Sequence, residues 1–288
     1  MKITAAKEDD FPHIHDFLAP HEFFCTVLAS KIRRREEGIF IVRTDSAKED
    51  RIFGVFQLNG TLFHCFPDFT DFSTGNSGFC AAAEFCAEFM EFIKDKKIKC
   101  VSGEEKSSEF LMKLIEISGR KPYFRNSYIL MTLKKMSVSD FPHILPDGAR
   151  VVRAVSGDDR IIFGIQKNYL EEEVVPPGKV LSDFEVRISL RQILNSQIVL
   201  LVVKEKKVAA KLNTNAVGFE WIQLGGVYTE KEFRRSGYAF TLVSAISGRI
   251  NGNGRGVCLF VKKDNIAAIR LYRKAEFSEK CGYLIAYY

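Results

Sequence analysis

The chain has 288 residues, of which 46% are hydrophobic and 27% are charged, so it is long enough for two ordinary hydrophobic cores and has the composition of a globular protein. It contains no apolar run of the roughly 18 residues that a membrane-spanning helix needs, and its N-terminus turns acidic where a signal peptide would be apolar. We therefore expect a cytoplasmic protein without a membrane segment.

The net charge of +6 lies in residues 136–288, because residues 1–135 contain equal numbers of basic and acidic side chains. A basic surface of this kind suits an anionic cofactor with several phosphates. No basic run interleaved with aromatic residues is present, so we expect no nucleic-acid partner.

The cysteines are odd in number and irregularly spaced, and none forms a Cys-x-x-Cys pair. This pattern predicts reduced thiols, most of them buried, with neither a metal site nor a disulfide framework. The seven positions are Cys25, Cys65, Cys80, Cys86, Cys100, Cys258 and Cys281.

Apolar periodicity predicts an α/β protein in which strands and helices alternate. In the first half, a strand near Ile3 is followed by a helix over Phe79 to Lys97, a strand over Ile98 to Val101, a helix over Ser108 to Ile117 and a strand over residues 127–131. In the second half, the predicted elements are a strand near Val152, helices over Ile161 to Glu173 and Asp183 to Leu194, a hairpin of Ile198 to Lys204 with Val208 to Asn213, a strand over Trp221 to Val227, a helix over Phe240 to Ile250, a strand over Val257 to Val261, a helix around Tyr272 and a final strand to Tyr288.

The two halves begin and end alike, which indicates an internal repeat. Both residues 3–10 and residues 152–159 read apolar-x-Ala-x-x-x-Asp-Asp, and residues 127–131 resemble residues 282–286 as apolar closing strands. We predict two similar domains, residues 1–135 and 150–288, joined by a linker over residues 136–149.

An anion-binding turn is predicted between the strand that ends near Val227 and the helix that follows it. The turn carries Arg234-x-x-Gly237-x-Ala239. Free N–H groups at a helix start attract phosphate, and a glycine lets the phosphate approach the main chain.

A second strand-to-helix unit follows about thirty residues later and contains Asn265-x-x-Ala268-x-x-Leu271-Tyr272-x-Lys274 with Phe277. The two motifs, in this order, resemble the acyl-CoA-binding core of the GCN5-related N-acetyltransferases. One departure is Glu276, where that family usually has glycine.

The resemblance implies the acyl-CoA N-acyltransferase fold, with a mixed sheet and helices on both faces, in two tandem copies. It also implies transfer of an acetyl group from acetyl-CoA to a primary amine by direct attack in a ternary complex, without a metal. Tyr272 is then the proton donor to the leaving thiolate, since a phenol stays protonated at neutral pH. The residues expected to bind acetyl-CoA are Val227, Tyr228, Thr229, Arg234, Arg235, Ser236, Gly237, Tyr238, Ala239, Asn265 and Ala268.

Three of these roles have structural alternatives. Tyr272 has the spacing of a core-facing aromatic residue, Asn265 has the position of a helix N-cap, and Arg234 has the setting of a surface arginine. The main-chain groups of Val227 and Thr229 are expected to be free to pair with the pantetheine arm like an added strand.

The general base is the least determined role. All five histidines lie at or before position 143, so the second half has none. Glu220, near the start of the cofactor strand, is one candidate, and the acidic run of residues 171–173 is another. The remaining alternatives are a water chain or a group from the first half, and the identity of the amine is left open.

The first half has a weaker version of the same pattern. Gly75-Asn76-Ser77-Gly78 stands in the place of the anion-binding turn but has no arginine, and the helix that follows lacks the Asn-x-x-Ala pattern. We interpret this half as a copy that has lost cofactor binding and that shapes the acceptor cleft. The alternative for the whole protein is a non-catalytic acyl-CoA-binding or interaction protein.

Overall fold

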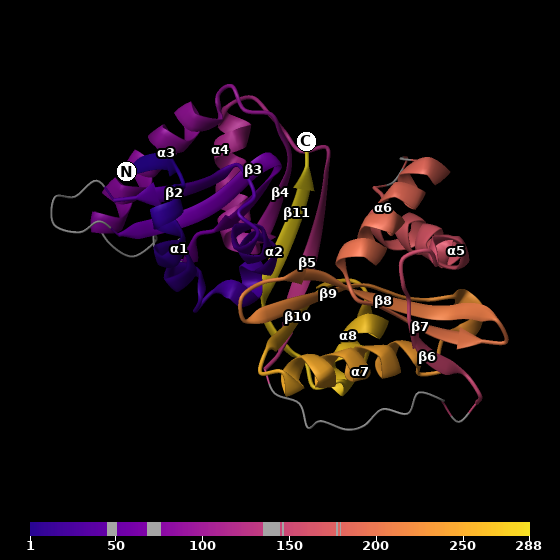
Figure 1. Ribbon diagram of the computed structural model, residues 1–288. Coiled ribbons are helices and arrows are strands. Elements are labelled where there is room, and N and C mark those ends of the chain that lie inside the picture. Colours follow the sequence, from indigo (N-terminus) through magenta and orange to yellow (C-terminus); the bar gives the residue numbers. More distant parts are fainter. Residues whose placement is uncertain (45–50, 68–75, 135–144, 146, 177, 179) are drawn as a thin grey trace.

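The strands of the two halves form one continuous sheet. The structure, a computed structural model, describes residues 1–44, 51–67, 76–134, 145, 147–176, 178 and 180–288. Within these residues eleven strands pair in the order β1-β2-β3-β4-β11-β5-β10-β9-β8-β7-β6 (Figure 1). Most of the predicted linker, and Gly75 of the first-half turn, lie outside the described residues. The division into two domains stays a prediction.

The strands are β1 (Lys2–Ala5), β2 (Ile39–Arg43), β3 (Ile52–Cys65), β4 (Ile98–Glu104), β5 (Phe124–Leu133), β6 (Arg150–Arg153), β7 (Val199–Lys204), β8 (Lys207–Val217), β9 (Trp221–Thr229), β10 (Gly256–Lys262) and β11 (Ser278–Tyr287). The helices are η1 (Glu8–Asp10), α1 (Phe11–Leu18), α2 (Glu22–Arg33), α3 (Asn76–Ile93), α4 (Glu105–Ile117), α5 (Asp159–Tyr169), η3 (Leu170–Val174), α6 (Asp183–Ser196), η4 (Lys231–Phe233), α7 (Tyr238–Gly252) and α8 (Ile266–Lys274). No helix among the described residues has the length and apolar character needed to cross a membrane.

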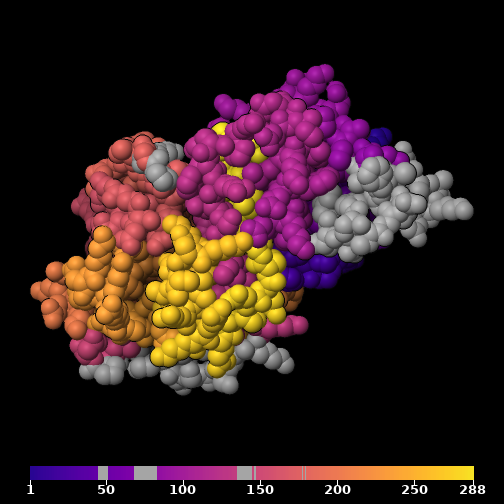
Figure 2. All heavy atoms as spheres, turned by 180° about the vertical axis from the view of Figure 1, so that it is seen from behind, coloured from indigo at the N-terminus to yellow at the C-terminus, as the bar shows by residue number. Residues whose placement is uncertain are grey.

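The closing strands of the two halves are exchanged. β11, from the second half, pairs with β4 of the first half, whereas β5, from the first half, pairs with β10 of the second half. The two exchanged strands pair antiparallel with each other at the centre of the sheet, where Tyr128 lies opposite Tyr283 (Figure 1). Each half is therefore completed by a strand from the other half. On the face shown in Figure 2, the atoms of the two halves lie directly against one another.

The order of elements is repeated in the two halves, as the sequence predicts. In the first half, β3 and β4 are parallel and α3 connects them; in the second half, β9 and β10 are parallel and α7 connects them. Each parallel pair is followed by one helix, α4 or α8, and by a closing strand. The helix predicted from Phe240 begins two residues earlier, at Tyr238.

The turn that ends α8 explains how glutamate replaces the glycine of the family motif. Glu276 adopts φ 65°, a left-handed conformation that favours glycine, and its N–H donates to the Arg273 carbonyl at 3.0 Å. The turn is thus kept despite the substitution, at a cost of about 1 kcal/mol in backbone strain.

The phenylalanines of the first half form a packed core rather than a binding surface. One cluster of buried side chains contains Phe53, Phe56, Phe66, Phe85 and Phe89. Burial of such rings is a major source of stability, at roughly 1.5–3 kcal/mol for each side chain. Six cysteines of the described residues are free thiols: Cys25, Cys65 and Cys258 are buried, and Cys86, Cys100 and Cys281 are partly buried.

A buried carboxylate ties the first half to the strand that leads into the site. Glu22, at the start of α2, is fully buried and accepts hydrogen bonds from the main-chain N–H groups of Phe219, Glu220 and Trp221 at 2.7, 3.0 and 3.1 Å. Burial raises the pKa of Glu22, against the lowering effect of these three donors. Gly218 is required beside it, because a Cβ there would lie 2.0 Å from Glu22 Oε1.

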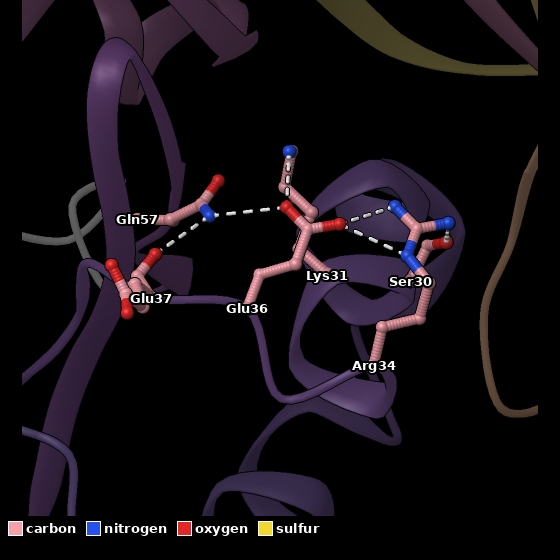
Figure 3. A network of polar contacts seen from close by, with 6 residues as sticks. All are labelled: Ser30, Lys31, Arg34, Glu36, Glu37 and Gln57. Atoms are coloured by element: carbon pink, nitrogen blue, oxygen red, sulfur yellow. Dashed lines mark hydrogen bonds and ion pairs between the residues drawn. The ribbon is translucent and has the colours of Figure 1, made fainter. Parts of the chain in front are cut away.

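The other end of α2 is anchored within the first half. Glu36 accepts hydrogen bonds from Lys31, Arg34 and the Gln57 amide of β3 (Figure 3). Burial acts to raise the pKa of Glu36, but the bonds from Lys31 and Arg34 outweigh it and lower the pKa. With both ends held, α2 connects the first half to the β8–β9 turn.

Replacement of Glu22 tests this connection. Glu22→Ala leaves three main-chain donors without their acceptor, so we expect the free energy of unfolding, measured by urea denaturation, to fall by about 2–3 kcal/mol. Glu91→Ala is the matched control, because Glu91 is 77% exposed and its pair with Lys94 spans 3.9 Å, and we expect a change below about 0.5 kcal/mol. Equal effects of the two variants would contradict the role given to Glu22.

Candidate functional site

The site begins where two parallel strands stop pairing. β9 and β10 pair from Trp221–Gly256 to Leu224–Leu259, and beyond these residues each strand continues without the other. The last five residues of β9 and the last three of β10 therefore lie on either side of a wedge-shaped opening. Strands that diverge in this way leave main-chain groups for a ligand to pair with.

The turn after β9 has the backbone conformation of an anion site. Arg235 and Gly237 both adopt left-handed φ, 68° and 78°, and Gly237 is the N-cap of α7 without a side-chain hydrogen bond to the helix. The first N–H groups of α7 thus have no partner within their own helix. A Cβ on Gly237 would have no atom within 4 Å, so the space in front of these amides is open.

Arg234 is held at the edge of this turn by an ion pair. Its Nη2 donates to Glu172 Oε1 at 2.7 Å, and its Nε donates to the Thr229 carbonyl at 3.1 Å. The same carboxylate accepts from the Tyr228 hydroxyl at 2.9 Å, and the pKa of Tyr228 is raised to about 12, by burial and by Glu172. The Thr229 carbonyl accepts this one hydrogen bond and keeps a second lone pair, so its pairing with pantetheine stays a prediction.

Asn265 has the N-cap role that its position suggests. Its Oδ1 accepts from the Ala268 N–H at 3.1 Å, which begins α8 immediately after β10. Asn265 and Ala268 also line the opening between the strands. The cap thus orients α8 so that Tyr272, two turns further, faces the same space.

Two cavities meet at Tyr272. The first, here called the cradle cavity, has a volume of about 630 Å³ and includes Arg234, Arg235, Gly237, Tyr238 and Ala239 in its wall. The second, here called the amide cavity, has a volume of about 380 Å³. Five residues line both cavities: Glu173, Val227, Asn265, Ala268 and Tyr272.

Tyr272 is suited to donate a proton. Its side chain is 6% exposed, and burial raises its pKa, with smaller contributions in the same direction from Tyr169 and Glu173. A phenol in this environment remains protonated throughout the neutral range. Tyr272 is therefore a buried core residue that also lines both cavities.

The amide cavity is polar and is shared between the two halves. Four side-chain amides line it, those of Gln166, Asn213, Asn215 and Gln223. Among the described residues that line the amide cavity, the charged ones are Glu173 and Lys262, which form an ion pair at 3.1 Å. Tyr128 of the first half also lines it, because the exchanged strand β5 places Tyr128 opposite Lys262.

Two residues of the predicted site line neither cavity. Glu220, suggested as the base, is exposed at the beginning of β9, at the opposite end of the strand from Thr229, and it lines neither cavity. Ser236 is exposed in the anion-binding turn and also lies outside both cavity walls. The carboxylate that lies at the junction is Glu173, from the acidic run of residues 171–173.

The first half fills the space that is open in the second. The pairing of β3 with β4 ends at Phe63–Ser102, and the next residue, His64, packs so closely on Gly103 that a Cβ there would lie 2.2 Å from His64 Nε2. Burial lowers the pKa of His64 to about 3. Glu104 caps α4 as Asn265 caps α8, so Leu111 takes the place of Tyr272. The phenol is therefore replaced by a hydrocarbon side chain.

Sequence reasoning missed Lys211, a buried lysine beside the amide cavity. It is 1% exposed, and its Nζ donates to the Gly226 carbonyl at 2.8 Å. Burial lowers its pKa to about 7. The available signal was a single lysine within the apolar segment from Val208 to Leu212.

The pH dependence of stability tests the state of Lys211. The pKa of Lys211 is about 7 in the folded chain, whereas the ordinary pKa of lysine is 10.5. Between these pH values the unfolded chain therefore binds a proton that the folded chain does not. The contribution of Lys211 to the free energy of unfolding therefore rises with pH in this window, by up to about 1.4 kcal/mol per pH unit. We expect Lys211→Met to lose this slope, so that the stability of wild type relative to the variant improves from about pH 7 to about pH 9 in urea denaturation. If the free energies of unfolding of wild type and variant changed in parallel with pH, the pKa of Lys211 would not be lowered.

Comparison with known proteins agrees with this geometry. Residues 197–284 match the FR47-like protein family, and this region contains β7 to β11 almost completely. A comparison of the sequence with curated proteins finds no match.

Solved structures with a similar fold span nearly the whole chain. A GCN5-related N-acetyltransferase from Sphaerobacter thermophilus is 19% identical with a TM-score of 0.57, and the match covers 99% of this chain and 94% of that one. An acetyltransferase of the GNAT family from Colwellia psychrerythraea is 11% identical with a TM-score of 0.54, covering 100% and 99%. A Drosophila protein is 11% identical with a TM-score of 0.65, covering 99% and 98%.

The fold of the whole chain is thus similar to that of solved GCN5-related N-acetyltransferases, and residues 197–284 match the FR47-like protein family.

Proposed function

We propose that this protein transfers an acetyl group from acetyl-CoA to a primary amine by direct attack in a ternary complex. The observation that carries the proposal is that Tyr272 lies where the cradle cavity meets the amide cavity. A donor in one cavity and an acceptor in the other would bring their reacting atoms together at this residue. Such positioning supplies a large part of the rate enhancement in group transfer.

The cradle cavity would hold coenzyme A. The diphosphate would accept hydrogen bonds from the N–H groups at the start of α7, in the open space in front of Gly237. The positive end of the helix and the guanidinium of Arg235 would add electrostatic attraction. The pantetheine arm would then lie along the free edge of β9 near Val227, with the sulfur toward Tyr272.

The amide cavity would hold the amine. Its amides and hydroxyls are hydrogen-bonding groups for a small polar acceptor, and Glu173 supplies a carboxylate at the junction. The amine nitrogen attacks the thioester carbonyl carbon, a C–N bond forms and the C–S bond breaks. The Tyr272 hydroxyl gives its proton to the leaving sulfur, while the Glu173 carboxylate takes the proton from the amine nitrogen.

Release of free thiol from acetyl-CoA, in the presence of a panel of amines, tests the reaction. We expect Tyr272→Phe to lower kcat by about 100-fold or more, since general acid catalysis contributes about 10²–10⁴. The affinity for acetyl-CoA, measured by calorimetry, is expected to stay the same because the phosphate site is intact.

Tyr283→Phe is the control for loss of a buried phenol. Tyr283 is 2% exposed, and its hydroxyl forms a hydrogen bond of 2.9 Å with Ser102, a residue of the first half. We expect kcat to change by less than about 2-fold, because only the hydrogen bond to Ser102 is lost. Full activity of Tyr272→Phe would exclude Tyr272 as the acid, and binding of acetyl-CoA without thiol release for any amine would favour a non-catalytic acyl-CoA-binding protein.

Substitution of Gly237 tests the phosphate site separately. Gly237→Val places a branched side chain over the amides and requires a β-branched residue at φ 78°, so we expect at least a 10-fold rise in the dissociation constant of CoA, which is about 1.4 kcal/mol. Gly254→Val, at φ 77° in the turn after α7, is the control for backbone strain alone, and CoA affinity should be unchanged. Normal CoA binding by the Gly237 variant would place the diphosphate elsewhere.

A further inference from the structure

Lys211 occupies an unusual position for a lysine. Its side chain extends from β8 into the protein and is 1% exposed. Nζ donates to the Gly226 carbonyl at 2.8 Å and to Asn213 Oδ1 at 3.4 Å, and it lies 4.5 Å from the centre of the Tyr169 ring. In the described part of the chain it has no ion pair with a carboxylate. Burial of an amine without a counter-charge opposes folding, so stability does not explain this lysine.

The contacts of Lys211 are made to an irregularity in β9. In the pairing of β8 with β9, Lys211 lies opposite Tyr228 and Asn213 lies opposite Gly225, so that Gly226 and Val227 together face the single residue Leu212. Gly226 has the left-handed φ of 60° that such a bulge favours.

Lysine, asparagine and glycine fit together closely at this bulge. A Cβ on Gly226 would lie 1.9 Å from Asn213 Oδ1 and 2.6 Å from Lys211 Nζ. Any other residue at position 226 would displace both side chains. The bulge and the lysine are therefore parts of one arrangement.

The bulge directs a main-chain donor toward the junction of the cavities. A peptide unit is planar and trans, so its C=O and N–H groups point in opposite directions. When Lys211 holds the Gly226 carbonyl, it also fixes the direction of the Val227 N–H. Val227 lines both the cradle cavity and the amide cavity.

We propose that Lys211 is a positioning residue for acyl transfer, which acts through the Gly226 carbonyl to direct the Val227 N–H at the thioester oxygen and, when protonated, adds a positive charge behind that peptide. This inference rests on the proposed acetyl transfer. A preorganised donor is most effective where negative charge develops, and the thioester oxygen becomes negative during attack by the amine.

The proposal has a pH dependence with a definite sign. The pKa of Lys211 is lowered to about 7 by burial, so the charge is present below this pH and is lost above it. On the elements around Lys211, Tyr169 of α5 lies against the amine and Tyr228 of β9 lies opposite Lys211. The other titratable groups on α5, η3 and β8 include Asp159, Lys167, Glu171, Glu172, Glu173 and Lys207. Burial raises the pKa of both tyrosines to about 12, and the pKa of Glu172 is lowered, because the bonds from Arg234 and Tyr228 outweigh its burial. These three groups keep one protonation state while Lys211 titrates.

The test compares kcat for wild type and Lys211→Met from about pH 6 to about pH 9, with acetyl-CoA and an accepted amine. Below pH 7 we expect the variant to be about 10–100-fold slower, with the KM for acetyl-CoA within about 2-fold, since the loss is in the transition state. Above pH 7 the ratio of wild-type to variant kcat should decline. Lys207→Met is the matched control, because Lys207 is on the same strand with a 71% exposed side chain, and its ratio should stay near one.

Two results would overturn the proposal. A ratio that is the same at every pH would mean that Lys211 only fills space, and a ratio that increases with pH would mean that the neutral amine accepts a proton. If Lys211→Met does not fold, as judged by circular dichroism, Lys211→Gln removes the charge with a polar side chain and the same declining ratio is expected.

Failure of the proposed acetyl transfer and failure of the role of Lys211 would give different results. A wild-type protein that releases no thiol with any amine would refute acetyl transfer itself. An active wild type whose Lys211 variants have unchanged kcat would refute only the role of Lys211.

Discussion

The divergence of β9 from β10 is the constraint on which the rest of the site depends. Parallel strands normally satisfy each other's main-chain groups along their length, but here pairing stops at Leu224 and Leu259. The opening has to be lined by other elements. These are α7, which follows β9 after the turn that contains η4, and α8, which follows β10. The start of α7, the free part of β9 and the Tyr272 phenol are thereby placed around one opening.

The first half contributes structure to the candidate site of the second half. It supplies β5, which covers the free edge of β10 and brings Tyr128 into the amide cavity, and it supplies Glu22, which holds the turn before β9. Its own parallel pair is closed by His64, and Leu111 stands where the phenol would be. These contacts accord with the interpretation of the first half as a copy that supports the candidate site of the other half.

Much of the fold was predictable because it is encoded locally. Apolar periodicity placed the elements of the second half to within a few residues, and the glycine and asparagine of the two motifs are where a left-handed turn and an N-cap require them. The exchange of β5 and β11 was not predictable, since Tyr128 and Tyr283 lie in strands of the same pattern and either strand could close either half. Tyr128 was missed for this reason. Glu220, which lines neither cavity, was singled out because a strand position alone does not show which end of the strand faces a cavity.

The central claim is that coenzyme A lies across the start of α7 with its sulfur at the junction of the two cavities. A crystal structure of the protein with CoA tests it most directly. The account predicts the diphosphate on the N–H groups next to Gly237 and the sulfur within hydrogen-bonding distance of the Tyr272 hydroxyl. CoA bound elsewhere, for example in the first-half cavity of about 820 Å³ between Glu109 and Arg125, or a sulfur remote from Tyr272, would contradict it.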